Sequence, residues 1–437
     1  MQNSSRRQFI KSSATVAGAS VLGGPTVTKA TALKVDINNS LPTQFPRIMG
    51  PNALKYVGEV IEGGLVGANS MVTRFERAFA EELGVKHCIA TPGCTPALAA
   101  LAAAFNFQHG DEIIVSPISD YGTLQGLVRE YYIPVFADAA PESVNLSAQT
   151  IEPCITDRSR AILVVHKTGL ICDMDPINEL AKKHGLLVYE DACQAVFGRY
   201  KGKLVGTLGD AAAFSFDAEK TMGSDLGGCV VTNDDELAHQ VRIVGQGRGV
   251  TGSKAGFGRI HSVPGYAYRM PGCTAAICLA QLETIHPQVA QRDRMIRLLT
   301  KLLAEIPGIR PLAIPDFMDV YSAWMCSFSI EPDHFKCTVD DFSQQLAAAG
   351  IPGAGTGRYY LLAAGSTFLG KNAEAKKYPY SMPPASREYH YGMESCPVAW
   401  DFLQTWIRWA TFCEKYTEQH CQLVQQIVSE VATKNRR

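Results

Sequence analysis

The stretch from residue 188 to residue 228 reads VYEDACQAVFGRYKGKLVGTLGDAAAFSFDAEKTMGSDLGG. It begins at the end of an apolar run, Leu186 to Tyr189, which predicts a buried strand that ends near Asp191. A second apolar strand, expected over Ala212 to Phe216, leads to Lys220. Ligands of open α/β sheets bind just beyond the carboxyl ends of the strands. The two strand ends therefore predict one site that contains both a carboxylate and a lysine.

These two residue types suit a specific chemistry. A lysine fixed beyond a buried strand, with Gly223, Gly227 and Gly228 leaving space around it, suits Schiff-base formation with an aldehyde or ketone. An acid on a neighbouring strand suits the partner of the pyridinium nitrogen of pyridoxal 5'-phosphate (PLP). Each residue alone has a simpler explanation, because lysines after strands are usually solvated and an Asp that opens a loop is usually a turn or cap residue. The whole pattern, rather than either residue, favours a PLP site.

A series of short motifs in this stretch resembles the signature of the DegT/DnrJ/EryC1/StrS family of sugar aminotransferases. That signature reads roughly E-D-A-A-Q, then G-D, then F-S-F, then the lysine and a later G-G. The matching residues here are Glu190-Asp191-Ala192-Cys193-Gln194, Gly209-Asp210, Phe214-Ser215-Phe216, Lys220 and Gly227-Gly228. The resemblance extends over nearly the whole chain after Ser70, and it implies the PLP-dependent transferase fold of type I.

The alternation of short apolar strands with helical segments also predicts a mostly parallel sheet with helices on both faces. Strands are expected over residues 87–90, 112–115, 134–137, 161–165 and 229–232, and helices over residues 71–83, 97–105 and 177–184. From about Arg292 the pattern changes to helix, loop and short strands. Together with the resemblance, this predicts a large α/β domain with a seven-stranded type of sheet over residues 33–291. A smaller α+β domain is expected over residues 292–437.

The resemblance implies a catalytic role for each residue that matches the central motifs. Lys220 would form the Schiff base with PLP and, once freed by the amino donor, would move a proton between the substrate carbon and the cofactor. Asp191 would keep the pyridine nitrogen protonated, so that the ring can take up carbanion charge. Gln194 would hydrogen-bond the phenolic oxygen of the ring.

A turn at residues 91–96, TPGCTP, is expected to bind the phosphate of the cofactor. A strand, a tight turn and a helix start together present free N–H groups and the positive end of the helix dipole to an anion. Many strand–helix turns look like this, so the pattern by itself is weak. The resemblance implies that Thr95, with the backbone of Cys94 beside it, holds the phosphate together with Ser215.

The chain departs from the family at the residue that stacks on the pyridine ring. Relatives carry an aromatic residue there, and the aligned position here is Asp120, with Tyr121 one step beyond. Either Tyr121 takes the stacking role through a local shift, or the ring is covered differently. We favour Tyr121.

Four further residues are expected near the substrate. His166 matches the family's V-H-x-x-G and has either a structural or a functional role. Arg269 lies in Gly265 to Met270, which resembles the family's G-Y-N-Y-R-M. Arg358 and Tyr359 belong to a glycine- and tyrosine-rich segment that can stack on a sugar or pack as an ordinary loop.

Residues 1–32 are interpreted as a twin-arginine signal peptide. Ser5-Arg6-Arg7-Gln8-Phe9 is followed by a mildly apolar segment and by Ala30-Thr31-Ala32, a small-residue cleavage site. We expect export to the periplasm, whereas a disordered basic N-terminus would leave the protein cytoplasmic. The 13 cysteines form no C-x-x-C pair, so no structural zinc site is indicated.

Composition and charge exclude several other classes. The formal net charge is -1 with no basic stripe, which argues against nucleic acid or an anionic membrane as a partner. No apolar run of about 18 residues or more is present, so a membrane-spanning helix is not expected. No G-x-G-x-x-G follows the first strand, which disfavours a nicotinamide oxidoreductase.

The sequence therefore predicts a PLP-dependent aminotransferase that moves an amino group from Glu or Gln to a keto-sugar, a nucleotide keto-sugar or a keto-cyclitol. The resemblance implies a homodimer with shared active sites. One alternative is a PLP-dependent sugar dehydratase, although those relatives replace the lysine by histidine. Another is a non-catalytic exported protein that binds a sugar or a sensor partner, which would be consistent with the departures from the family at Asp120, Leu226 and Gly245.

Overall fold

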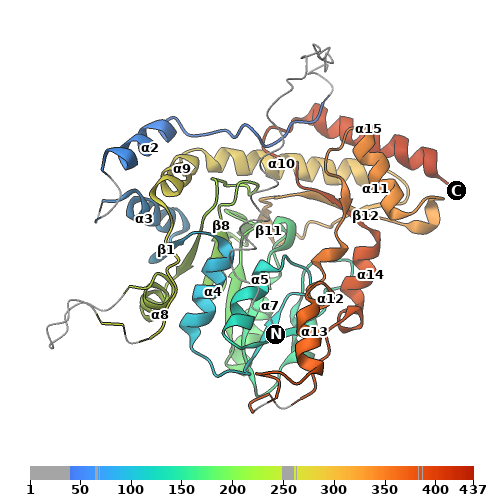
Figure 1. Cartoon of the computed structure of the whole chain (residues 1–437). Coiled ribbons are helices and arrows are strands. Elements are labelled where there is room, and N and C mark those ends of the chain that lie inside the picture. The colour runs from blue at the N-terminus through green and yellow to red at the C-terminus, as the bar shows by residue number, and fades with distance from the viewer. Residues whose placement is uncertain are drawn as a thin grey trace, which may run out of the picture. The chain divides into compact units, whose positions relative to one another are not determined.

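The computed structural model places seven strands in one sheet, in the order β1-β9-β8-β5-β4-β2-β3 (Figure 1). β8, β5, β4, β2 and β3 run parallel, and β9 runs antiparallel to both of its neighbours, β1 and β8. The strands are β1 (His87–Thr91), β2 (Glu112–Val115), β3 (Ile133–Phe136), β4 (Ser159–Val165), β5 (Leu187–Asp191), β8 (Ala211–Ser215) and β9 (Gly228–Thr232). This mostly parallel sheet confirms the predicted fold class.

The structure describes residues 40–63, 67, 69–248, 260–261, 263–381, 383–385 and 387–437. Residues 41–437 form one compact unit. The predicted signal peptide lies outside the described residues, so export remains a prediction. None of the helices in these ranges has the length and apolar character needed to cross a membrane.

Helices alternate with the strands along the chain and pack against both the large sheet and the C-terminal part (Figure 1). In chain order they are α2 (Ala53–Glu62), α3 (Met71–Leu83), α4 (Cys94–Phe105), α5 (Gly122–Arg129), α6 (Ala148–Ile151), α7 (Met174–His184), α8 (Asp235–Gln240), α9 (Gly272–Leu282), α10 (Ile285–Ala304), α11 (Val339–Ala348), α12 (Leu362–Gly365), α13 (Thr367–Glu374), α14 (Pro397–Thr405) and α15 (Glu418–Asn435). The predicted helix over residues 71–83 is confirmed with both ends in place.

Helix α3 illustrates how local signals lead to the site. The Ser70 hydroxyl accepts a hydrogen bond from the Thr73 N–H at 3.3 Å and so caps the first turn. Gly84 ends the helix in the left-handed conformation, with φ of 72°. Between these ends the buried Phe79 packs edge-on against Phe216, with ring centroids 5.3 Å apart. Phe216 directly follows β8, so this packing fixes the strand end that leads to Lys220.

A second, antiparallel sheet follows in the C-terminal part of the chain, in the order β10-β12-β14-β13. Its strands are β10 (Ile309–Pro311), β12 (Cys326–Ile330), β13 (Gly355–Thr356) and β14 (Trp406–Trp409), and a small third sheet contains β11 (Met318–Val320), β6 (Arg199–Tyr200) and β7 (Lys203–Leu204). The predicted domain boundary after residue 291 falls inside α10, and the division into two domains stays a prediction.

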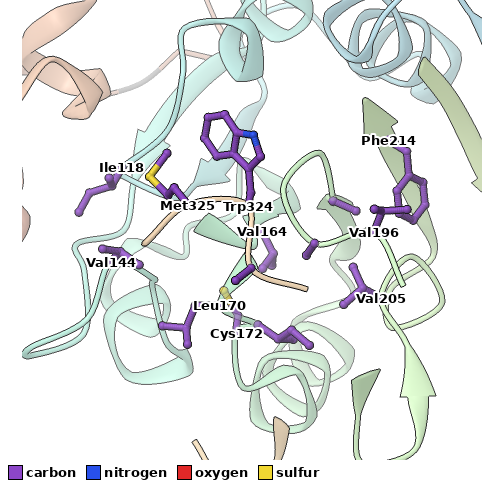
Figure 2. Close-up of a cluster of buried hydrophobic side chains, with 14 of the residues drawn as sticks. Ile118, Val144, Val164, Leu170, Cys172, Val196, Val205, Phe214, Trp324 and Met325 are labelled. Atoms are coloured by element: carbon purple, nitrogen blue, oxygen red, sulfur yellow. The ribbon is translucent and has the colours of Figure 1, made fainter. Parts of the chain in front are cut away.

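The segment before β12 reaches the large sheet. Trp324 and Met325 belong to one cluster of buried hydrophobic side chains with Val164 of β4 and with Leu170, which follows that strand (Figure 2). The Trp324 N–H backbone group donates to the Thr168 carbonyl at 3.0 Å. This contact brings an indole ring from the C-terminal part of the chain to the carboxyl ends of the parallel strands.

Candidate active site

A cavity of about 610 Å³ lies where β5 and β8 end. Six of the seven predicted cofactor-binding residues line it, together with the predicted substrate residue Tyr359. The six are Lys220, Asp191, Gln194, Ser215, Thr95 and Cys94. The order of the strands explains this convergence, because β5 and β8 are parallel neighbours and Asp191 is paired with Ala213 in the sheet. These six residues, which lie between residue 94 and residue 220 in the sequence, therefore share one cavity.

Asp191, the last residue of β5, is only 2% exposed. Its Oδ2 accepts a hydrogen bond from the Thr123 hydroxyl at 2.8 Å, and the Thr123 hydroxyl is 2.7 Å from that of Ser119. Its Oδ1 accepts from the Cys193 N–H at 3.3 Å. These neutral donors orient the carboxylate without neutralising its charge. The carboxylate is therefore suited to pair with a cationic group of a ligand in the cavity.

Gln194 has a fixed orientation. Its Oε1 accepts a hydrogen bond from the Thr168 N–H at 2.7 Å. Thr168 itself adopts φ of 63°, and its hydroxyl is 3.2 Å from that of Tyr321. Because Oε1 is already used, Nε2 is the group that Gln194 offers to the cavity, and it can only donate.

Lys220 follows β8 at the end of a turn in which its N–H donates to the Asp217 carbonyl at 3.0 Å. Its Nζ lies 3.8 Å from the centre of the Trp324 ring. The Trp324 indole is held in turn, because its Nε1 donates to the Glu219 carbonyl at 2.9 Å. From the N-terminal side, the Arg47 guanidinium donates to the Ala218 carbonyl at 3.1 Å and also to the Lys220 carbonyl. The lysine is thus held on a braced turn at the cavity wall.

The opposite end of the cavity is built for an anion. α4 begins at Cys94, and both Thr95 and Ser215 line the cavity there. β9 runs directly past this turn, and a Cβ placed on Gly228 would lie 2.4 Å from the Gly93 carbonyl carbon and 2.6 Å from the Cys94 nitrogen. The second glycine of the G-G motif is therefore needed for the close approach of two backbones.

Tyr121, proposed above to stack on the cofactor ring, does not line this cavity. Its side chain is 46% exposed, and its ring packs edge-on against Phe368 at 5.7 Å between centroids. Asp120, the residue before it, is the one that lines the cavity. The reason is local, because α5 begins at Gly122 and the chain turns outward at Tyr121. The stacking role of Tyr121 is left without support from its position.

His166 is fully buried and does not line the cavity. Its Nδ1 accepts from the Cys172 N–H at 3.3 Å, so the other ring nitrogen carries the proton and donates to Glu190 Oε2 at 3.0 Å. Glu190 also accepts three backbone N–H bonds from the loop between β7 and β8, which come from Gly206, Leu208 and Gly209. This network ties β4, β5 and that loop together, which fits the structural alternative for His166.

The two predicted arginines lie elsewhere. Arg269 lines a separate cavity of about 430 Å³, together with Arg242 and Arg248. Arg358 forms an ion pair with Asp340 at 2.8 Å and also bonds to Gln404. The structure therefore keeps both arginines out of the main cavity.

Lys167 is a residue that sequence reasoning missed. It occupies one of the unspecified positions of V-H-x-x-G, is 0% exposed, and its Nζ lies 3.2 Å from the centre of the Tyr360 ring. That amine has no hydrogen-bond partner among the described residues. Burial, and to a smaller extent the nearby charge of Lys220, lower the pKa of Lys167 to about 7, against the opposing effects of Cys193, Asp120 and Asp191. Tyr360 itself lines the cavity, so this second amine lies directly behind its wall.

The aromatic segment of the C-terminal part is divided between two places. Tyr359 and Tyr360 line the cavity. Arg387 and Tyr389, farther along, instead bind Glu112 at the start of β2, with the Tyr389 hydroxyl donating at 2.7 Å. The second half of the segment is therefore structural and lies at the other end of the sheet.

A comparison with protein families shows which family the chain belongs to. Residues 48–399 match the model of the DegT/DnrJ/EryC1/StrS aminotransferase family. The chain belongs to this family. It is a PLP-dependent aminotransferase, which confirms the predicted family, activity and cofactor.

Two relatives of this DegT/DnrJ/EryC1/StrS aminotransferase act in sugar or cyclitol chemistry according to their names. GDP-perosamine synthase of Caulobacter vibrioides is 38% identical over 262 residues, which cover 60% of this chain and 69% of the relative. A second relative, from Micromonospora echinospora, is named as an L-glutamine:3-amino-2,3-dideoxy-scyllo-inosose aminotransferase. It is 34% identical over 275 residues, which cover 62% of this chain and 65% of the relative. Among solved structures, 3-amino-5-hydroxybenzoic acid synthase has a TM-score of 0.76 at 24% identity. That match covers 90% of this chain and 100% of the other, and it shows the shared fold.

Proposed function

We propose that this aminotransferase moves an amino group from glutamate or glutamine to a keto-sugar, a nucleotide-linked keto-sugar or a keto-cyclitol. The names of two relatives support the substrate class, since one refers to a GDP-linked amino sugar and the other to L-glutamine and a cyclitol ketone. The observation that carries the proposal is the placement of Lys220 and Asp191 in one cavity, at the ends of neighbouring parallel strands.

The residues around the cavity fit PLP. Asp191 offers a buried, oriented carboxylate to the ring nitrogen, and Gln194 offers a fixed N–H donor to the phenolic oxygen. The start of α4 lines the cavity at Gly93, Cys94 and Thr95, where the free N–H groups of a helix start can bind a phosphate. Thr95 and Ser215 supply hydroxyl groups at the same end. The cradle thus matches the three polar ends of the cofactor.

Bound PLP supplies an electron sink for the negative charge that develops at the substrate carbon. Asp191 keeps the proton on the ring nitrogen, which maintains that sink. Lys220 Nζ would hold the cofactor and, as a free amine, would move a proton between the substrate carbon and the cofactor. The indole of Trp324 covers the lysine from the C-terminal part of the chain and limits access of water.

The acceptor is expected to lie near Tyr359 and Asp120. Both side chains line the cavity, and Tyr359 is 57% exposed, so its ring is available to a sugar face. The Tyr359 hydroxyl accepts a hydrogen bond from Arg408 at 3.3 Å, which orients the ring. We therefore expect the side of the cavity formed by Tyr359 and Asp120 to determine which acceptor binds.

Two further features of the proposal come from the resemblance and from the N-terminal sequence. We propose a homodimer, as in other members of the family, and export by the twin-arginine route. A route that carries folded proteins allows PLP to be loaded before export. Sedimentation of the purified chain and fractionation of cells that express it with and without residues 1–32 test these two points.

The enzymatic proposal is tested by absorption spectroscopy of the purified, PLP-loaded chain. We expect a visible band that glutamate or glutamine bleaches and that a keto-sugar restores. In Lys220→Ala the band and the transfer are expected to be lost, whereas Lys377→Met, at an exposed lysine, retains both. Mass spectrometry of the product separates the alternatives, because an aminotransferase replaces the carbonyl by an amine and a dehydratase removes water. A band that no amino donor bleaches would indicate a binding protein and contradict the proposal.

A further inference from the structure

Two cysteines and the catalytic-site aspartate form a compact cluster inside the cavity. The Sγ atoms of Cys94 and Cys193 and a carboxylate oxygen of Asp191 all lie within 4.8 Å of one another. Cys94 Sγ is 3.8 Å from Asp191 Oδ1. All three residues line the cavity, so a ligand that enters it meets these atoms directly.

The spacing of the cluster suits a tetrahedral metal ion. With Zn–S bonds of about 2.3 Å and Zn–O bonds of about 2.1 Å, a sulfur and an oxygen ligand of a tetrahedral zinc site are separated by roughly 3.6 Å. The 3.8 Å between Cys94 Sγ and Asp191 Oδ1 matches that edge, and the 4.8 Å limit on the other pairs requires only a small side-chain adjustment. Two sulfur ligands and one oxygen ligand, with a fourth position open to the cavity, are typical of a zinc site that keeps one exchangeable ligand.

The surroundings of the cluster also favour a cation. The Thr123 hydroxyl donates to Asp191 Oδ2, while Oδ1 accepts the Cys193 N–H and lies 3.8 Å from Cys94 Sγ. Donors outside the ligand set orient metal-binding carboxylates in this way.

We propose that Cys94, Cys193 and Asp191 form a binding site for a thiophilic divalent cation, Zn²⁺ in the first place, that is mutually exclusive with PLP. Exclusion follows because Asp191 cannot serve both the ring nitrogen and a metal ion. The PLP-free chain is then open to capture by zinc, and loading with PLP protects it. The metal site itself does not depend on the proposed function; only the competition with PLP does.

The test uses the full chain under reducing conditions, prepared with and without PLP, and Co²⁺ as a visible probe that Zn²⁺ displaces. We expect the PLP-free chain to bind one Co²⁺ with the intense thiolate-to-cobalt absorption of a tetrahedral site. Cys94→Ala and Cys193→Ala are each expected to weaken Zn²⁺ binding at least about 10-fold. Cys273→Ala, at an exposed thiol, and Cys88→Ala, at a buried thiol outside the cavity, serve as controls and are expected to bind as the wild type does.

The competition is measured in the same samples. The PLP-loaded chain is expected to take up no Co²⁺ at this site, and prior addition of Zn²⁺ is expected to slow the appearance of the PLP band. Equal metal binding by the wild type and the two cavity variants would overturn the site, since the metal would then be held by other groups. Equal binding with and without PLP would overturn the exclusion. A chain that binds zinc through Cys94 and Cys193 yet never shows a PLP band would count against the proposed function and leave the metal site standing.

Discussion

Replacement of Lys167 by methionine is expected to stabilise the protein near neutral pH. The Lys167 side chain is 0% exposed, and burial lowers its pKa from 10.5 to about 7. Between these values the unfolded chain binds the proton and the folded chain does not, so stability rises with pH across that window and the full penalty applies below it. At 1.36 kcal/mol per pKa unit, the difference of 3.5 units sets a penalty of about 4 kcal/mol at pH 7. Methionine has a similar length and removes the titrating group.

The measurement is urea unfolding of the wild type and Lys167→Met at pH 7 and at pH 9. Over these two pH units the wild type is expected to gain about 2 kcal/mol relative to the variant, because half or more of the penalty is relieved. Lys377→Met, at an exposed lysine, is the matched control and is expected to follow the wild type within about 0.5 kcal/mol. A variant that is less stable than the wild type at pH 7, with the same dependence on pH, would refute the account and imply that the amine has a partner in the folded protein.

Two other substitutions test the packing that holds the site. Gly228→Ala places a Cβ 2.4 Å from the Gly93 carbonyl carbon, so we expect a loss of about 1–3 kcal/mol in unfolding free energy and weaker PLP binding. Gly58→Ala, where a Cβ meets nothing within 4 Å, is the control and should be neutral or stabilising. Equal behaviour of the two variants in PLP titration would argue against the close approach. Glu414→Gln removes the charge that faces the fully buried Arg292 at 2.7 Å, and we expect a cost of about 3 kcal/mol in urea unfolding. A change below about 1 kcal/mol would mean that solvent reaches this pair.

The fold was predictable because local signals and burial agree along most of the large sheet. Helix α3 has a serine cap before it and a glycine after it, and both occupy those roles in the structure. β2 is a run of four buried residues and occupies the predicted positions. Such local signals do not determine the order of the strands in the sheet. It depends on which runs pair across the sheet, and for that the resemblance to a known family was needed.

The site was predictable to the extent that it consists of residues at strand ends. Asp191, Ser215 and Lys220 follow directly from that rule, since parallel strands bring their carboxyl ends together. Asp120, the position aligned with the family's stacking residue, does line the cavity, whereas Tyr121, the next residue, points to the surface just before α5 begins.

Residues that join the site from a distance were predictable only in part. Tyr359 was expected near the substrate because of its glycine- and tyrosine-rich segment, and it lines the cavity, but no motif marks Trp324, which lies more than 100 residues from Lys220. Lys167 had a signal that was passed over, namely a charged residue in a segment that directly follows a buried strand. Arg358, in contrast, was predicted near the substrate but forms an ion pair with Asp340. Asp340 is far enough away in the sequence that this pairing is visible only in the structure.

The central claim is that Lys220, and no other amine of the cavity, carries the cofactor. Reduction of the PLP-loaded chain with borohydride, followed by digestion and peptide mass spectrometry, tests it most directly because the reduced linkage stays on the lysine that formed it. The account predicts that the label is found on Lys220 and is absent from the peptide that contains Lys167. A label on Lys167, the second amine behind the cavity wall, or on neither lysine would contradict it.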